Sequence, residues 1–306
     1  MLIHLAEIEI GGLSMLRLLA LLLLAISAVP AAAQDFRSDR ISVEVRGSGP
    51  DVVLIPGLTS SPSVWDGTVA ALPDYRYHLV HVAGFAGKPA GANATGPVVA
   101  PVAEEIARYI AEARLERPAL VGHSLGGSWA MMVAARHPDR VSRVMVVDML
   151  PFLGAMFSPN ATPETLRPMV DGMRSRITAA TGDGRRQNAE QTIASMVRTE
   201  NLRPSAVEHS MTSDLAVVGQ AMHDLMLTDL RPELRNIRVP ITVLWVNPPG
   251  APVTTEQMTG FYRMSYANAP HAVVKQIPNS YHFIMWDAPE AFQAELRVFL
   301  DAQAAQ

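Results

Sequence analysis

Short, nearly all-apolar runs recur along this chain, and stretches with helical periodicity separate them. The runs with the clearest strand character are Asp51–Ile55, Tyr77–Val82, Ala119–Val121, Val144–Val147, Val239–Val246 and Val273–Ile277, preceded by the alternating segment Ile41–Val45. A strand that is apolar on both faces must be covered on both faces. The pattern therefore predicts an α/β fold, with a mostly parallel central sheet flanked by helices.

The predicted helices fall into two groups. Pro97–Arg114, Trp129–Arg136 and Pro289–Leu300 lie between or after strands, so we expect them to flank the sheet. Between Pro151 and Arg238 the strand pattern disappears, and a helical, methionine-rich segment takes its place. We interpret residues 34–150 and 239–306 as the core of the fold and residues 151–238 as an inserted helical cap.

The N-terminal region has the parts of a secretory signal peptide. The apolar run Leu18–Val29 follows Arg17 and precedes small residues that end at Ala33. We therefore expect residues 1–33 to be removed and the protein to be exported to the periplasm or the medium. Acidic residues before the run fit no part of a signal, which favours Met15 as the true start. An uncleaved anchor helix is the alternative, but the run is short for a bilayer, and we expect no membrane span after cleavage.

Composition excludes several classes of function. The chain has 25 Lys and Arg against 29 Asp and Glu, with no basic stripe, which argues against a nucleic-acid partner. It has no cysteine, so disulfides, thiolate nucleophiles and zinc–sulfur sites are excluded. Because no group of His and carboxylate residues has ligand spacing, we expect neither a metal nor an organic cofactor.

One motif carries the candidate chemistry. Residues 122–126 read Gly-His-Ser-Leu-Gly, between a predicted strand and a predicted helix. A serine in this context sits on a sharp turn that raises its hydroxyl above the sheet, and the helix that follows favours developing negative charge. Ser124 is therefore the candidate nucleophile. The alternative, a glycine-rich turn without chemistry, fits the flanking elements less well.

These residues belong to a sequence that resembles the α/β-hydrolase fold superfamily over nearly all of the chain after residue 33. Ile55–Leu58 is similar to the oxyanion loop of that superfamily, and Tyr281–Phe283 to the loop that bears its catalytic histidine. The resemblance implies His282 as the general base of Ser124. It also implies an oxyanion hole formed by the backbone N–H groups of Leu58 and Leu125.

The third member of the triad departs from the common pattern of the superfamily. The loop 247–253, which usually carries the acid, contains no carboxylate. Glu256 is the nearest acid, but it lies in the first turn of a predicted helix, where acids are common. Asp287 is interpreted as a helix N-cap. Asp148 ends the buried strand Val144–Val147, so Asp148 is the preferred triad acid and Glu256 the alternative.

A serine nucleophile implies acyl transfer, so the leading hypothesis is a hydrolase of carboxylic esters, with lactones and polyesters left open. The Met-rich cap suggests a small, uncharged and apolar ester as its partner, although these residues could simply pack the cap. A cofactor-free haloperoxidase-like enzyme and a carbon–carbon bond hydrolase are the alternative enzymes. A binding protein without catalytic activity is a further alternative. The sequence does not indicate an oligomeric state.

Overall fold

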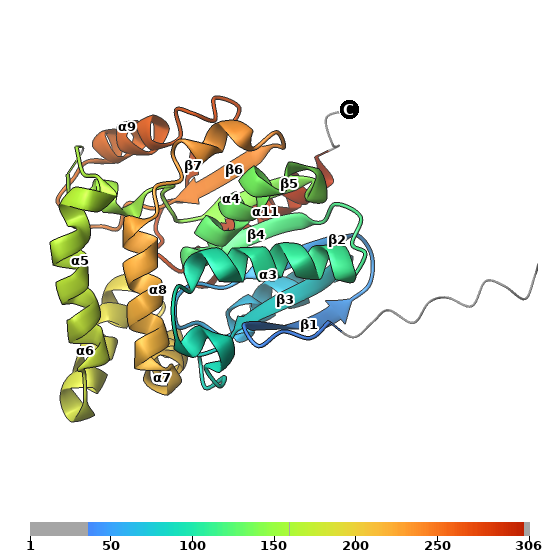
Figure 1. Cartoon of the computed structure of the whole chain (residues 1–306). Helices are drawn as coiled ribbons and strands as arrows, with labels where there is room; N and C mark the ends of the chain where they lie inside the picture. The colour runs from blue at the N-terminus through green and yellow to red at the C-terminus, as the bar shows by residue number, and fades with distance from the viewer. Residues whose placement is uncertain (1–35, 159, 303–306) are drawn as a thin grey trace, which may run out of the picture. The chain divides into compact units, whose positions relative to one another are not determined.

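A seven-stranded sheet forms the centre of the computed structural model, which describes residues 36–158 and 160–302 (Figure 1). The strand order is β1-β3-β2-β4-β5-β6-β7. The strands are β1 (Ile41–Gly47), β2 (Asp51–Ile55), β3 (Arg76–Val82), β4 (Ala119–His123), β5 (Arg143–Val147), β6 (Ile241–Trp245) and β7 (Val273–Gln276). β1 pairs antiparallel with β3, and the other neighbouring pairs are parallel. The mostly parallel sheet expected from the apolar runs is confirmed.

Successive residues of the inner strands β2 to β6 enter opposite apolar layers, which explains why these runs are apolar throughout. Val53 and Ile55 of β2 pack with the helices α3 (Val99–Glu112) and α4 (Leu125–Arg136). Val52 and Leu54 pack on the other side with residues of η1 (Pro62–Trp65) and α11 (Pro289–Asp301). Two further short helices, α2 (Asp66–Ala71) and α10 (Ile284–Asp287), lie next to these elements in the chain. The sheet is therefore covered on both faces.

Helix α4 begins earlier than the sequence pattern predicted. We expected a helix from Trp129, but α4 starts at Leu125 and includes Gly126 and Gly127. Glycine disfavours helix formation, so the pattern placed the start after this pair. Here close packing overrides propensity: a Cβ on Gly126 would lie 2.2 Å from the carbonyl oxygen of Ile55. The absence of side chains lets the first turn of α4 lie directly against β2.

The segment between β5 and β6 is helical, as predicted. It contains α5 (Pro163–Thr178), α6 (Gly182–Met196), α7 (Arg203–Thr212) and α8 (Leu215–Leu227), with short 3₁₀ turns η4 (Leu153–Met156), η5 (Glu200–Leu202) and η6 (Glu233–Asn236). Figure 1 shows the four α-helices beside the sheet. One set of α8 side chains, Val217, Val218, Ala221 and Leu225, joins the main core. Met226 of α8 and Val170 of α5 belong to a separate small cluster. The insertion is thus anchored to the sheet through α8.

The predicted signal peptide falls on residues outside the described ranges, so the structure does not test it. Of the helices within those ranges, none is long and apolar enough to cross a bilayer.

A buried polar network lies near the start of β2. His78 of β3 is 3% exposed, and its Nε2 lies 2.8 Å from Oδ1 of Asp51 while its Nδ1 lies 2.6 Å from the hydroxyl of Tyr109. Burial lowers the pKa of His78, against the opposing effect of Asp51. Burial also acts to raise the pKa of Asp51, but hydrogen bonds from Arg76 and His78 outweigh it and lower that pKa.

These shifts predict that acid destabilises the fold. Below the ordinary histidine value of 6.5, the unfolded chain takes up a proton that folded His78 resists, so the free energy of unfolding falls with pH. Asp51 acts in the same direction at lower pH, because its contribution is lost as pH falls through its lowered pKa. Denaturant unfolding measured above and below pH 6.5 checks this expectation. A His78→Gln variant should be less stable at neutral pH but lose less stability on acidification; equal losses in both proteins would contradict the assignment.

Candidate active site

The three candidate triad residues lie at the carboxyl ends of parallel strands. Ser124 follows β4, Asp148 follows β5, and His282 lies in the loop after β7. The carboxyl ends of parallel strands meet at one edge of the sheet, where α/β proteins place their ligands. The fold therefore brings these residues, which are far apart in sequence, to the same edge.

Ser124 sits on a strained turn. Its φ is 53° and its ψ is −125°, a conformation that residues with a side chain rarely adopt. A Cβ on Gly122 would lie 2.1 Å from the carbonyl oxygen of Gly126, so the strand and the helix can meet this closely only with glycine there. The expected sharp turn at Ser124 is confirmed, and the close contact explains why glycine occupies position 122.

The strand ladder holds both Ser124 and Asp148 through their backbone N–H groups. The N–H of Ser124 donates to the carbonyl of Val147 at 2.9 Å, and the N–H of Asp148 donates to the carbonyl of Leu244 at 2.7 Å. Asp148 also has a φ of 53°. Each residue thus continues the hydrogen bonding of its strand and then turns away from the sheet.

Asp148 contacts the histidine ring directly. Oδ2 of Asp148 lies 2.6 Å from Nδ1 of His282, and the two side chains are 11% and 21% exposed. The other oxygen, Oδ1, accepts hydrogen bonds from the N–H of Val246 at 3.2 Å and from the hydroxyl of Tyr262 at 3.1 Å. This arrangement fixes the carboxylate against the ring nitrogen that faces away from the nucleophile in a triad.

Glu256 does not take part in this contact. It is exposed in the first turn of α9 (Thr255–Ser265), behind the capping box that Thr254 forms with Gln257. In the preceding loop, the side-chain amide of Asn247 donates to the carbonyl of Val253 at 3.1 Å. The structure thus brings Asp148, rather than Glu256, to His282.

The remaining link of the triad is open in this structure. Among the hydrogen bonds of the described residues, none joins Oγ of Ser124 to the His282 ring. Such hydrogen bonds are often long before substrate binds and tighten in the reactive complex. Because Nδ1 of His282 faces Asp148, Nε2 is the ring nitrogen left for Ser124.

The predicted oxyanion loop lies against the nucleophile. A Cβ on Gly57 would lie 3.0 Å from Cβ of Ser124, so the backbone of the Gly57–Ser60 turn approaches the serine closely. Leu58 is within this turn. Leu125 is the first residue of α4, where a backbone N–H has no partner inside the helix. The structure therefore brings the backbone of the turn that contains Leu58, and the first turn of α4, close to the serine.

His123 supports the histidine loop, the segment 281–283 that carries His282. It is fully buried, and its Nε2 donates to the carbonyl of His282 at 3.0 Å. Burial, with a smaller effect from His282, lowers the pKa of His123 well below its usual value, so the ring is neutral. The ring centroids of His123 and His282 are 4.6 Å apart. His123 therefore holds the backbone of the loop that carries the candidate base.

The interpretation of Asp287 as an N-cap is wrong. The residue at the N-cap of α11 is Ala288, without a side-chain cap, and Asp287 belongs to α10. Its carboxylate accepts from the backbone N–H of Tyr281 at 3.0 Å, of Arg198 at 3.0 Å and of Thr199 at 2.8 Å. It therefore ties the histidine loop to the insertion, which sequence spacing could not show because Arg198 and Thr199 lie far from Asp287 in the chain.

The sequence analysis also missed Tyr262. Burial, followed by the negative charge of Asp148, raises the pKa of Tyr262 well above its usual value, so its hydroxyl is protonated and donates. The ring stacks on Trp245, with centroids 5.1 Å apart and an interplanar angle of 22°. In the sequence, an aromatic residue on the apolar face of a helix indicates a core position, and no motif marks it as part of a site.

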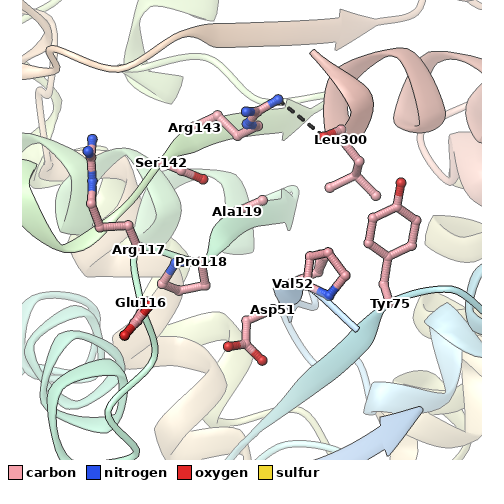
Figure 2. Close-up of a pocket in the computed structure, with 11 residues that line it drawn as sticks. Asp51, Val52, Tyr75, Glu116, Arg117, Pro118, Ala119, Ser142, Arg143 and Leu300 are labelled. Atoms are coloured by element: carbon pink, nitrogen blue, oxygen red, sulfur yellow. Dashed lines mark hydrogen bonds between the residues drawn. The ribbon is translucent and has the colours of Figure 1, made fainter. Parts of the chain in front are cut away.

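A cavity of about 330 Å³ lies elsewhere (Figure 2). Its lining includes Asp51, Ala119 and Arg143, the first residues of β2, β4 and β5, so it opens at the amino ends of the strands. Buried Arg143 donates to the carbonyls of Phe299 at 2.7 Å and Leu300 at 3.3 Å, which caps the end of α11. This cavity is at the opposite edge from Ser124. Within residues 36–158 and 160–302, no group of three or more His, Cys, Asp or Glu could hold a metal.

Comparison with known proteins agrees with this arrangement. The model of the Alpha/beta hydrolase family matches residues 52–295. A pimeloyl-[acyl-carrier protein] methyl ester esterase of Vibrio atlanticus is 29% identical over 220 residues, covering 68% of this chain and 80% of the relative. The enzyme with the same description from Pectobacterium carotovorum is 25% identical over 270 residues, covering 85% and 98%.

Solved structures show the same fold. The enol-lactonase from Burkholderia xenovorans superposes with a TM-score of 0.68 at 19% identity, covering 85% of this chain and 96% of that one. An esterase from Exiguobacterium antarcticum gives 0.70 at 21% identity, covering 86% and 96%. The family model covers most of the sheet and the three candidate residues. The chain therefore belongs to the alpha/beta hydrolase family.

Proposed function

We propose that this chain hydrolyses small, uncharged carboxylic esters through an acyl-enzyme on Ser124. The observation that carries the proposal is the 2.6 Å contact between Asp148 and His282 beside the strained serine turn. A serine hydroxyl is a weak nucleophile at neutral pH and needs an adjacent base that a third group orients. The site has a residue for each of these roles.

The reaction follows from the geometry. His282 removes the proton of the Ser124 hydroxyl as the serine oxygen attacks the ester carbonyl, and it returns this proton to the departing alcohol. Asp148 holds the ring with Nδ1 protonated and stabilises the imidazolium. The N–H groups of Leu58 and Leu125 stabilise the oxyanion, and one such donor is typically worth about 3–4 kcal/mol. Water then releases the acid by the same steps.

The environment of the site supports an uncharged substrate. Leu58 and Phe283 are apolar neighbours of the triad, and Phe283 stacks on Trp286 with ring centroids 4.8 Å apart. Bringing a charged group into apolar surroundings without a partner is unfavourable. The named relatives act on a methyl ester, which is uncharged at the reacting end. Several cap methionines pack into apolar clusters, so they give this preference little support.

A panel of matched esters tests the proposal. Neutral methyl and p-nitrophenyl esters should turn over faster than esters with a carboxylate on the same acyl chain, and Ser124→Ala should abolish most turnover while remaining folded. Initial rates and labelling of Ser124 by a phosphonate provide the measurement. A Ser124→Ala variant as active as the wild type would refute the proposal. Peroxide-dependent bromination without ester hydrolysis would favour the haloperoxidase-like alternative.

The triad acid is tested by two conservative variants. Asp148→Asn should lower kcat by a factor on the order of 10⁴, because the amide holds the wrong tautomer of the imidazole. Glu256→Gln should change kcat little, because Glu256 is exposed and distant from the ring contact. Steady-state kinetics on the best ester decide between them. The reverse pattern would make Glu256 the acid.

Export is a separate proposal, and it rests on the sequence of residues 1–33 alone. The mature protein should begin at or near Gln34 and should be recovered from the periplasm or the medium. Mass spectrometry of the protein from each fraction checks this expectation. Full-length protein confined to the cytosol would contradict it.

A further inference from the structure

We propose that Tyr262 is a positioning residue of the triad, which sets the orientation and charge of Asp148 through its hydroxyl; this inference rests on the proposed function. The loop after β6 lacks the usual acid, and the helix that follows it supplies this hydroxyl instead. The hydroxyl donates to Oδ1 of Asp148 at 3.1 Å while Oδ2 faces His282 at 2.6 Å. The two oxygens of one carboxylate therefore have separate partners.

The surroundings make Tyr262 a fixed donor. The side chain is 6% exposed, and its ring is held against Trp245, the last residue of β6. The backbone N–H of Val246 supplies the second hydrogen bond to Oδ1, so β6 and α9 together hold the carboxylate. Rotation of the carboxylate about its bond to Cβ would break both contacts.

The hydroxyl also affects the charge balance of the pair. With His282 neutral, Asp148 and His282 together carry one negative charge, and with His282 protonated they carry none. A hydrogen bond to the carboxylate stabilises the more negative state more strongly. Removing the hydroxyl therefore favours the protonated pair, in which His282 cannot act as a base.

Two buried titratable groups near the pair, His123 and Tyr266, stay neutral in the working range. Burial lowers the pKa of His123 well below its usual value, and burial raises that of Tyr266 well above its usual value. His123 lies beside the pair at the end of β4, and Tyr266, the C-cap residue of α9, is close enough to Asp148 for its charge to act on the tyrosine. A change in the acid limb of the pH profile therefore reports on the pair itself.

Tyr266 provides a matched control. It lies one helical turn after Tyr262, is 2% exposed, and donates its hydroxyl to the carbonyl of Met149 at 2.7 Å. Tyr262→Phe and Tyr266→Phe each remove one buried hydroxyl, from α9 and from its C-cap, and keep the ring. They differ in whether the lost partner is the carboxylate of Asp148.

The experiment compares both variants with the wild type on a neutral activated ester. Tyr262→Phe should lower kcat about tenfold with KM nearly unchanged, as expected for one lost hydrogen bond to a charged group. It should also move the acid limb of kcat/KM to higher pH. Tyr266→Phe should leave both close to the wild type. Phosphonate titration of Ser124 and thermal unfolding normalise each rate to folded protein.

Two outcomes separate the two proposals. In the first, the wild type hydrolyses the ester, and the two variants either match its kcat and acid limb or lose activity equally. The proposed positioning role of Tyr262 is then wrong, and the proposed function stands. If the wild type does not hydrolyse esters, or Ser124→Ala remains active, the proposed function itself fails.

Discussion

Close approach between the first turn of α4 and the strands β2 and β4 determines the geometry of the candidate active site. Gly122 and Gly126 leave no room for a Cβ, because one would lie within 2.2 Å of a backbone oxygen in each case. This packing forces Ser124 into a conformation that a residue with a side chain otherwise avoids. The strain lifts the hydroxyl out of the sheet, and the surrounding core maintains it. The positions of the oxyanion loop and of His123 follow from the same contact, since both lie against this turn.

Asp148 repeats the backbone arrangement of Ser124 one strand further along the sheet. Each residue donates its N–H to the neighbouring strand and then adopts a φ of 53°. Two adjacent strand ends can thus present their side chains above the same edge. The usual acid position after β6 is not required, because the end of β5 already lies within reach of the histidine loop. Helix α9 then takes a supporting role through Tyr262.

Much of the fold could be predicted from the sequence because the strands are apolar on both faces. The helical insertion could be predicted because residues 151–238 contain no apolar runs of the strand type. Ser124 was proposed from a motif and His282 from a family resemblance. Asp148 was proposed because the loop 247–253 contains no carboxylate. The predicted start of α4 was wrong because close packing outweighed the low helix propensity of glycine. The contacts of Asp287 and Tyr262 could not be predicted, since they join residues from distant segments. Tyr262 and Tyr266 share one helix face, and periodicity does not indicate which reaches the carboxylate.

The contacts of Asp287 constrain how the insertion can move. Its carboxylate holds Arg198 and Thr199 of the insertion and Tyr281 of the histidine loop at once, and the N–H of Phe283 donates to the carbonyl of Met196. Displacing this end of the insertion would pull on the segment that carries His282. Because α8 also packs into the main core, the insertion is held at two places, and residues 196–199 keep a fixed distance from the histidine loop. A substitution in the insertion can therefore change the orientation of the base without touching the triad.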